Sequence, residues 1–192
     1  MMKLYFAPGS SSMAPHIALL ETGAPYQPVP ISFASKQQRS DDFLKINPEG
    51  KVPTLVADGT VMTEVAAILY YLARRHPEAR LWPEGDLNAE AQVISWMSFI
   101  ASTLHPARTK GVEHAKGVYA LTEKRLGTRA WAIGQYSIAD IHLFRLYWRI
   151  RDALEPYRAS LPAIEAHYAR MMTRPAVVRT LEIEKAAGYE LP

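Results

Sequence analysis

The sequence predicts an α/β unit with a mixed sheet at the amino-terminal end, followed by an all-helical unit. Between residues 3 and 76, strand-like runs alternate with short helical runs in the order β-α-β-α-β-β-α. From residue 81 onward the apolar residues follow helical spacing and no run reads as a strand. A short stretch containing Pro83 and Gly85 separates the two parts. We therefore expect domains at 1–80 and 87–192, joined by a linker at 81–86.

The amino-terminal elements follow from apolar runs and from the turn residues that end them. Gly23 ends the first helix, and Pro28 and Pro30 put the second strand at a sheet edge because proline donates no backbone hydrogen bond. The expected strands are 3–6, 26–31, 54–56 and 61–62, and the expected helices are 14–21, 43–46 and 64–76. Together these elements predict a four-stranded mixed sheet.

The carboxyl-terminal part reads as a helical bundle, with helices expected at 89–104, 112–126, 137–154, 163–172 and 177–187. One helix start is sharply marked. Ser137 and Asp140 fit a capping box, in which the serine caps the helix and the carboxylate reaches back to the serine amide. Tyr136 and Ile141 are spaced for the accompanying hydrophobic staple. This motif is expected to be structural.

Composition excludes several classes of protein. The 22 Lys and Arg residues barely exceed the 19 Asp and Glu residues, and the basic groups sit on amphipathic helical patterns, so we expect no nucleic-acid partner. There is no cysteine, no apolar run of membrane-spanning length and no histidine–carboxylate spacing typical of a metal site. We expect a cytoplasmic protein without a metal or a membrane anchor.

The first candidate for chemistry is the serine run between the first strand and the first helix. A helix N-terminus presents unpaired amides and partial positive charge, which favour an anion. A hydroxyl of Ser10, Ser11 or Ser12 placed there can donate to a thiolate and lower the pKa of the thiol. The alternative is a turn whose hydroxyls only cap the helix.

Three further signals each have a structural alternative. A cis bond before Pro53 would leave the backbone of Val52 free to pair with an extended peptide, whereas a trans proline would simply open an edge strand. Glu64 can grip the amino group of a ligand or merely favour the dipole of its helix. His105 is either a pH-sensitive hydrogen-bond donor or an ordinary helix-terminal histidine.

Taken together and in order, four segments resemble the glutathione transferase superfamily, most nearly its bacterial beta class. The segments are Lys3–Ser12, Asn47–Leu55, Thr63–Ile68 and Gly134–Asp140. The resemblance runs over nearly the whole chain. It implies a thioredoxin-like amino-terminal domain, an all-helical carboxyl-terminal domain, a homodimer, and glutathione as co-substrate.

The resemblance also implies roles for individual residues. Ser11 stands where the beta class has its cysteine, and Ser10, Ser12 and Tyr5 are the other hydroxyl donors near that position. The residues that would hold glutathione are Lys36, Lys51, Val52, Pro53, Glu64 and Val65, with Pro53 as the cis proline, and His105 would approach the thiol. Val65 replaces the usual serine, which removes one hydroxyl contact to the γ-glutamyl carboxylate.

The expected activity is transfer of glutathione to a small hydrophobic electrophile, as in detoxification. Because the chain has no cysteine, the reacting thiol must belong to the ligand. The region from His105 to Trp131 is shorter than is typical of the beta class, where these helices line the second-substrate pocket and reach the dimer interface. Two alternatives stay open: a glutathione-dependent isomerase, lyase or dehalogenase on the same scaffold, or a non-catalytic adaptor.

Overall fold

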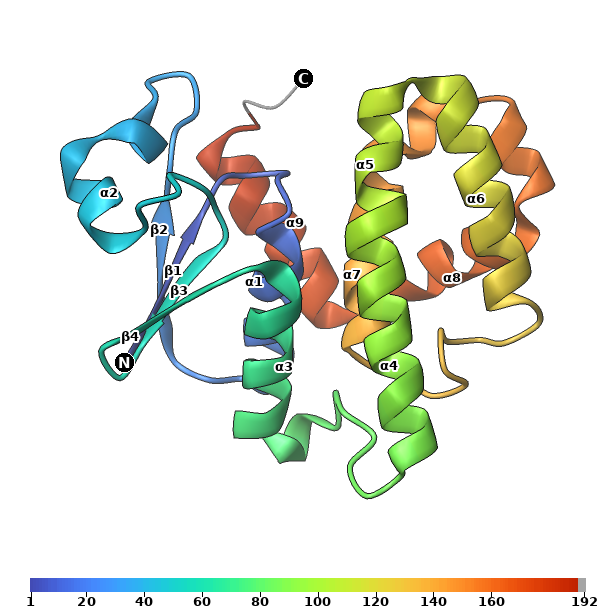
Figure 1. The fold of residues 1–192 in the computed structure, drawn as a ribbon, viewed down its shortest axis with the longest axis horizontal. Helices are drawn as coiled ribbons and strands as arrows, with labels where there is room; N and C mark the ends of the chain where they lie inside the picture. Colours follow the sequence, from blue (N-terminus) through green and yellow to red (C-terminus); the bar gives the residue numbers. More distant parts are fainter. Residues whose placement is uncertain (190–192) are drawn as a thin grey trace. The chain divides into compact units, whose positions relative to one another are not determined.

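The computed structural model describes residues 1–189 and divides into two compact units. The first unit comprises Met1–Ala79 together with the chain from Pro175 onward, and the second comprises Arg80–Arg174. Figure 1 shows the elements of both along the chain. An α/β unit and a helical unit are present as predicted, but the carboxyl-terminal helix belongs to the first of them.

The first unit is built on a four-stranded mixed sheet with the strand order β2-β1-β3-β4. β2 runs parallel to β1, whereas β3 is antiparallel to both β1 and β4. The elements are β1 (Met2–Phe6), α1 (Met13–Thr22), β2 (Tyr26–Pro30), α2 (Asp41–Ile46), β3 (Thr54–Ala57), β4 (Thr60–Thr63) and α3 (Val65–Arg75), with one-turn 3₁₀ segments at Gln37–Arg39 and Pro77–Ala79. The predicted order of elements and the edge position of β2 are confirmed.

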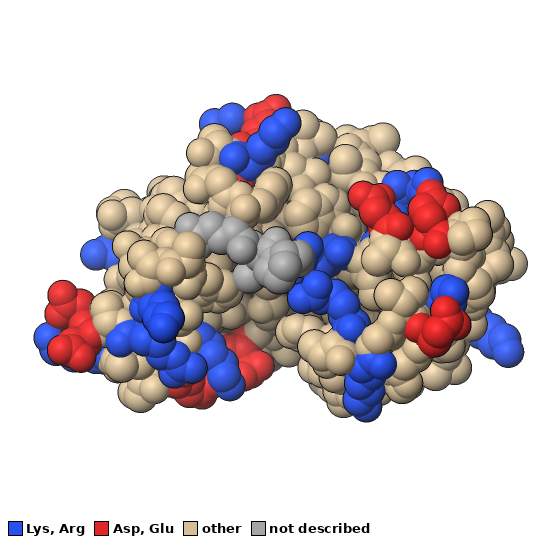
Figure 2. Space-filling model, turned by 90° about the horizontal axis from the view of Figure 1, so that it is seen from above, with Lys and Arg blue, Asp and Glu red and all other residues tan. Residues whose placement is uncertain are grey.

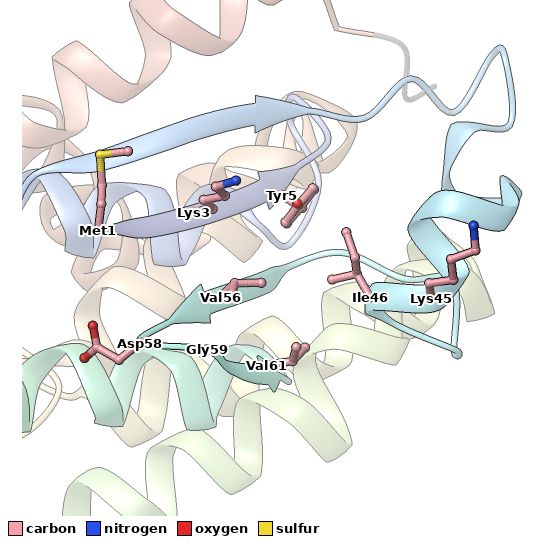
Figure 3. Close-up of a pocket in the computed structure, with 9 residues that line it drawn as sticks. All are labelled: Met1, Lys3, Tyr5, Lys45, Ile46, Val56, Asp58, Gly59 and Val61. Atoms are coloured by element: carbon pink, nitrogen blue, oxygen red, sulfur yellow. The ribbon is translucent and has the colours of Figure 1, made fainter.

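The two faces of this sheet differ. Met2, Leu4 and Phe6 of β1 are buried on the face covered by α1 and α3, as strand alternation requires (Figure 1). Lys3 and Tyr5 point to the other face, where a hollow of about 410 Å³ lies between the sheet and the end of α2 (Figure 3). The first face therefore holds the core, and the second stays partly open.

Helix α9 (Pro175–Ala187) corrects the expected domain boundary, which put residues 177–187 in a carboxyl-terminal domain at 87–192. Its buried face packs against α1 of the first unit, with Val177, Thr180 and Glu184 buried at helical spacing (Figure 1). Helical periodicity predicts the helix, but it does not say which partner the buried stripe meets.

The second unit is entirely helical over its described length. It contains α4 (Leu87–Phe99), a π-helical turn (Ile100–Leu104), α5 (His105–Ala107), α6 (Val112–Leu126), α7 (Ile138–Ile150) and α8 (Pro162–Met172), with 3₁₀ segments at Arg108–Lys110, Arg151–Leu154 and Tyr157–Ser160. Nearly all of α7 is buried among the other helices. The helices expected at 89–104 and 137–154 thus change type before they end.

The predicted capping box of α7 is present. The Ser137 side chain accepts from the Ala139 amide, and Asp140 Oδ2 accepts from the Ser137 amide at 2.9 Å. Asp140 is fully buried, and its Oδ1 also accepts from the Ala132 amide at 2.7 Å and bonds His167 Nε2 at 3.0 Å. The aspartate therefore joins three segments of the helical unit, which goes beyond the cap that the sequence predicts.

Surface charge is distributed in small groups. On the face drawn in Figure 2, Lys and Arg lie in several separate groups, some of them beside Asp or Glu and others with no carboxylate next to them. Several pairs span three residues of one segment: Lys45–Asp42, Lys116–Glu113, Arg158–Glu155 and Arg179–Glu182. Exposed pairs of this kind contribute at most about 1 kcal/mol each to stability. In residues 1–189, no helix combines the length and the apolar character needed to cross a membrane.

Candidate ligand site of the first unit

The strand register brings the predicted binding segments to one end of the sheet. Tyr5 lies opposite Thr54 across β1 and β3, and Thr54 lies opposite Thr63 across β3 and β4. The segments that adjoin this row are 7–12, 52–53 and 64–65. Because neighbouring strands are about 4.8 Å apart, these segments emerge within roughly 10 Å of one another.

The three serines at the tip of α1 have different surroundings. Ser12 is fully buried, and its hydroxyl bonds the amide and the carbonyl of Ala7, each at 3.1 Å, as well as the Ser10 hydroxyl. The Ser10 hydroxyl in turn accepts from the Ser12 amide. Ser11 is only half-buried, and neither its amide nor its hydroxyl has a hydrogen-bond partner in the described chain. Ser10 and Ser12 therefore hold the loop together, and Ser11 is the hydroxyl left for a ligand.

Tyr5 is the fourth predicted hydroxyl donor, and the structure does not bring it to the serines. It stands on the sheet face opposite α1, where it lines the open hollow (Figure 3). Its ring packs against Phe43 of α2, with 5.5 Å between ring centroids. Sequence could not resolve this point because an error of one residue in strand register moves a side chain to the other face.

The bond between Val52 and Pro53 is cis, as the resemblance implied. Within residues 1–189, the backbone amide and carbonyl of Val52 make no hydrogen bond, so both groups are available to an extended ligand. The turn before it is fixed by Asn47, which is almost fully buried and donates to the Lys51 carbonyl at 2.9 Å and to the Thr54 hydroxyl at 3.0 Å.

The residue before α3 has an unusual backbone conformation. Glu64 has φ 65° and ψ 126°, a region that residues other than glycine rarely occupy, and strain of this kind concentrates at functional sites. Its carboxylate is exposed and has no partner in the described part of the chain. The amide of Val65 opens the helix, and no residue of that part accepts a hydrogen bond from it. The Glu64 carboxylate, which can accept from an amine, and the Val65 amide, which can donate to a carboxylate, thus belong to neighbouring residues.

The two lysines that are predicted to bind glutathione differ in whether their side chains already contact a carboxylate. Lys36 follows β2, whose carboxyl end lies beside that of β1, and its exposed side chain forms no hydrogen bond or ion pair with residues 1–189. Lys51 is exposed and lies 3.4 Å from a Glu49 carboxylate oxygen. Lys36 is the better placed of the two to meet a free carboxylate.

His105 belongs to the second unit, and its predicted approach to the thiol stays a prediction. It follows the π-helical turn, where the His105 amide bonds the Ile100 carbonyl five residues back. Pro106 has no amide to give to the preceding turn, which accounts for the local change of helix type. Turns of this kind are frequent at functional sites.

Sequence reasoning missed a buried network that connects α9 to the serine loop. Glu184 is fully buried, and its Oε2 accepts from the Gly9 amide at 2.7 Å while its Oε1 lies 2.9 Å from Nδ1 of the buried His16. His16 Nε2 bonds the Tyr26 hydroxyl at 2.8 Å, and burial, followed by the Glu184 charge, raises the pKa of Tyr26 to about 12. No signal in the sequence pairs residues this far apart.

Comparison with known proteins decides the family. A family model described as the amino-terminal domain of glutathione S-transferase matches residues 1–74, and the corresponding carboxyl-terminal model matches residues 89–175. The chain belongs to the glutathione transferase family. The chain is also 34% identical over 199 residues to glutathione S-transferase GstA of Escherichia coli O157:H7, covering 95% of this chain and 98% of the relative.

Solved structures of other glutathione transferases share the fold. A sphingomonad glutathione S-transferase complexed with glutathione is 35% identical with a TM-score of 0.86, and the match covers 95% of this chain and 98% of that one. A beta-class enzyme of Sphingomonas chungbukensis is also 35% identical, with a TM-score of 0.84 and the same coverage. These matches support the beta-class resemblance that the sequence motifs indicated.

Proposed function

We propose that this chain is a glutathione-dependent transferase in which the Ser11 hydroxyl activates the thiol of bound glutathione. The observation that carries the proposal is that Ser11, alone among the three serines at the tip of α1, has a hydroxyl without a partner in residues 1–189. Relatives solved with glutathione bound support the choice of ligand. The same ligand suits the free groups at this end of the sheet.

The tripeptide would bind in an extended form across the edge formed by the three segments. Glu64 would accept from the α-amino group, and the Val65 amide would donate to the adjacent carboxylate at the positive end of α3. The free backbone groups of Val52 would pair with the cysteinyl unit beside Pro53, and Lys36 would meet the glycyl carboxylate. Lys51, next to this backbone, would add positive charge.

The reaction then needs a thiolate at the tip of α1. A free thiol with a pKa of about 8.5 is only a few per cent ionised at neutral pH. Donation from Ser11, together with the helix dipole, would lower this pKa by about 1–2 units, since one unit corresponds to about 1.4 kcal/mol. The sulfur forms a bond to the electrophilic carbon, the leaving group departs with its electron pair, and the thiol proton passes to solvent.

The test is the pH profile of conjugation to a chlorodinitrobenzene-type substrate. Ser11→Ala should lower kcat/KM about 10- to 100-fold near neutral pH, with recovery at high pH where the thiol ionises unaided. Ser160→Ala, an exposed serine of the helical unit, is the matched control and should leave the profile unchanged. An unchanged profile for Ser11→Ala would rule out the assigned role.

We further propose a cytoplasmic homodimer. Support comes from exposed large apolar side chains on helices of both units, including Tyr70 on α3 at 48% exposure and Ile94 on α4 at 60%. The lack of cysteine suits a reducing compartment. Light scattering on the purified protein should give twice the monomer mass, and a monomer mass at micromolar concentration would contradict the dimer.

A further inference from the structure

The open face of the sheet carries a hollow that the proposed function does not use (Figure 3). Its volume is about 410 Å³, and pockets for small molecules commonly measure about 300–1,000 Å³. Every residue that lines the hollow belongs to the first unit. Helices α1 and α3 cover the opposite face of the sheet, so neither helix closes the hollow.

Two valines form an apolar floor. Lys3, Val56 and Val61 are register partners across β1, β3 and β4, so their side chains stand in one row on the same face. Val56 is half-buried and Val61 is 43% exposed. Ile46, at the end of α2, adds an apolar wall (Figure 3). Because neighbouring strands are about 4.8 Å apart, one flat ring can contact both valines at once.

A free cation and a free hydroxyl stand beside this floor. Lys3 is exposed, and its ammonium group forms no hydrogen bond or ion pair with residues 1–189. The ring of Tyr5 packs against Phe43, whereas its hydroxyl has no partner in the described part of the chain. Lys3 and Tyr5 are two positions apart on β1, so they share a face with Cα atoms about 7 Å apart (Figure 3). One carboxylate between them can accept from both groups.

The other charged side chains of the hollow already have partners. Lys45 lies 2.9 Å from Asp42, and Asp58 accepts a hydrogen bond from Arg75. That hydrogen bond and the charge of Arg75 hold the pKa of Asp58 below its ordinary value, so this carboxylate is ionised and already paired at neutral pH. Of the cationic side chains that line the hollow, Lys3 is therefore the one left for a ligand.

The role that lysines have at sheet edges does not explain Lys3. Lysines on outer strands prevent a sheet from pairing with another chain. β1 lies between β2 and β3, and both of its backbone edges are already paired. Lys3 thus protects no free edge, and it places a charge at the border of an apolar floor.

We propose that this hollow binds a small planar carboxylic acid, with its ring on Val56 and Val61 and its carboxylate between Lys3 and Tyr5. The apolar floor favours a ring over a bare inorganic anion, and a single free cation favours one negative charge over several. The hollow shares no residue with the groups proposed to hold glutathione. The inference therefore does not rest on the proposed function, and loss of transferase activity would leave it standing.

The experiment is calorimetry on the full chain with 2-naphthoate and with 2-naphthamide, which has nearly the same shape and no charge. The wild type should bind 2-naphthoate saturably below about 1 mM and about tenfold more tightly than 2-naphthamide, because a hydrogen bond to a charged group adds roughly this factor or more. Lys3→Gln should reduce the affinity for 2-naphthoate to that for 2-naphthamide and leave 2-naphthamide binding unchanged. Raising the salt concentration from about 0.05 M to about 0.5 M should weaken 2-naphthoate binding alone.

Four variants separate charge, hydroxyl and floor. Lys3→Arg keeps the charge and should keep most of the preference, whereas Lys124→Gln removes an exposed lysine of α6 and should change nothing. Tyr5→Phe keeps the ring contact and should weaken 2-naphthoate binding several-fold. Val61→Thr makes the floor polar at nearly constant shape, so it should weaken both ligands by a similar factor. A thermal melt checks that each variant is folded.

Nuclear magnetic resonance of the labelled protein locates the bound ligand. Addition of 2-naphthoate should shift the amide signals of Lys3, Val56 and Val61, and saturating S-methylglutathione should leave its affinity unchanged. Equal affinity of the wild type for the two ligands, or an undiminished preference in folded Lys3→Gln, would overturn the proposal. Displacement of 2-naphthoate by S-methylglutathione would also overturn it, because the acid would then occupy the glutathione site.

Discussion

Glu184→Ala tests whether helix α9 holds the serine loop in its active shape. The substitution removes the acceptor of the Gly9 amide at 2.7 Å and the partner of His16 Nδ1 at 2.9 Å, in a place where Glu184 and His16 are both fully buried. The substitution removes the acceptor of two buried hydrogen bonds, and each loss of this kind costs about 1–3 kcal/mol, so the total is on the order of 3–5 kcal/mol. For a chain of this size, that loss lowers the melting temperature by on the order of 10 °C.

The effect of Glu184→Ala on the serine loop should be measurable as weaker glutathione binding. Gly9 is two residues from Ser11, so release of its amide loosens the position of the activating hydroxyl. We expect Glu184→Ala to weaken glutathione binding several-fold and to lower kcat/KM further, since catalysis depends on positioning within a fraction of an ångström. Urea unfolding and glutathione titration measure the two effects separately.

Two controls make the result decisive. Glu184→Gln keeps an oxygen for the Gly9 amide and an amide group that can donate to His16, so it should cost about 1 kcal/mol and leave binding nearly intact. Glu182→Ala, an exposed neighbour on the same helix, should have an effect below about 0.5 kcal/mol. If Glu184→Ala melted and bound glutathione like the wild type, the positioning role would be wrong.

Four further outcomes are expected. Ser12→Ala should lower the free energy of unfolding by about 1–3 kcal/mol in urea titrations, whereas Ser11→Ala should leave it unchanged, because the Ser12 hydroxyl makes hydrogen bonds within the described chain and the Ser11 hydroxyl makes none there. Asp140→Ala should cost about 3–5 kcal/mol by thermal melting, since four buried hydrogen bonds are lost. Burial lowers the pKa of His142 to about 3 in the folded protein, whereas its ordinary value is about 6.5. The unfolded chain therefore takes up a proton first as the pH falls below about 6.5, and the free energy of unfolding decreases by up to ~1.4 kcal/mol per pH unit. His142→Gln should flatten this slope in urea titrations at pH 5 and pH 7. Val65→Ser should tighten glutathione binding several-fold in calorimetry by supplying the hydroxyl that the beta class normally has.

Local sequence patterns predicted most of the fold because the residues that form each of these features lie close together in the chain. The hairpin around Gly59, the capping box at Ser137 and the helix end at Gly23 each depend on residues within a few positions of one another. The resemblance added the cis bond before Pro53, which the residues alone had left open. The hairpin, the capping box and the helix end were predictable because sequence spacing alone determines their contacts.

The remaining features depend on contacts between distant segments. The sequence indicated that Val177–Ala187 is helical, but its burial against α1 and the pairing of Glu184 with His16 need the folded chain. Likewise, three adjacent serines look alike in sequence, and only the turn geometry separates Ser11 from its bonded neighbours. The candidate site was thus predicted as a region, and the structure distinguishes the individual groups.

Thiol ionisation beside Ser11 can be measured by calorimetric titration of the wild-type protein with glutathione near pH 7, repeated in two buffers of different ionisation enthalpy. We expect saturable binding below millimolar concentration, with release of a large fraction of a proton per tripeptide as the thiol ionises beside Ser11; S-methylglutathione should bind without this release. No binding heat at millimolar glutathione, or binding with no difference in proton release between the two ligands, would contradict it.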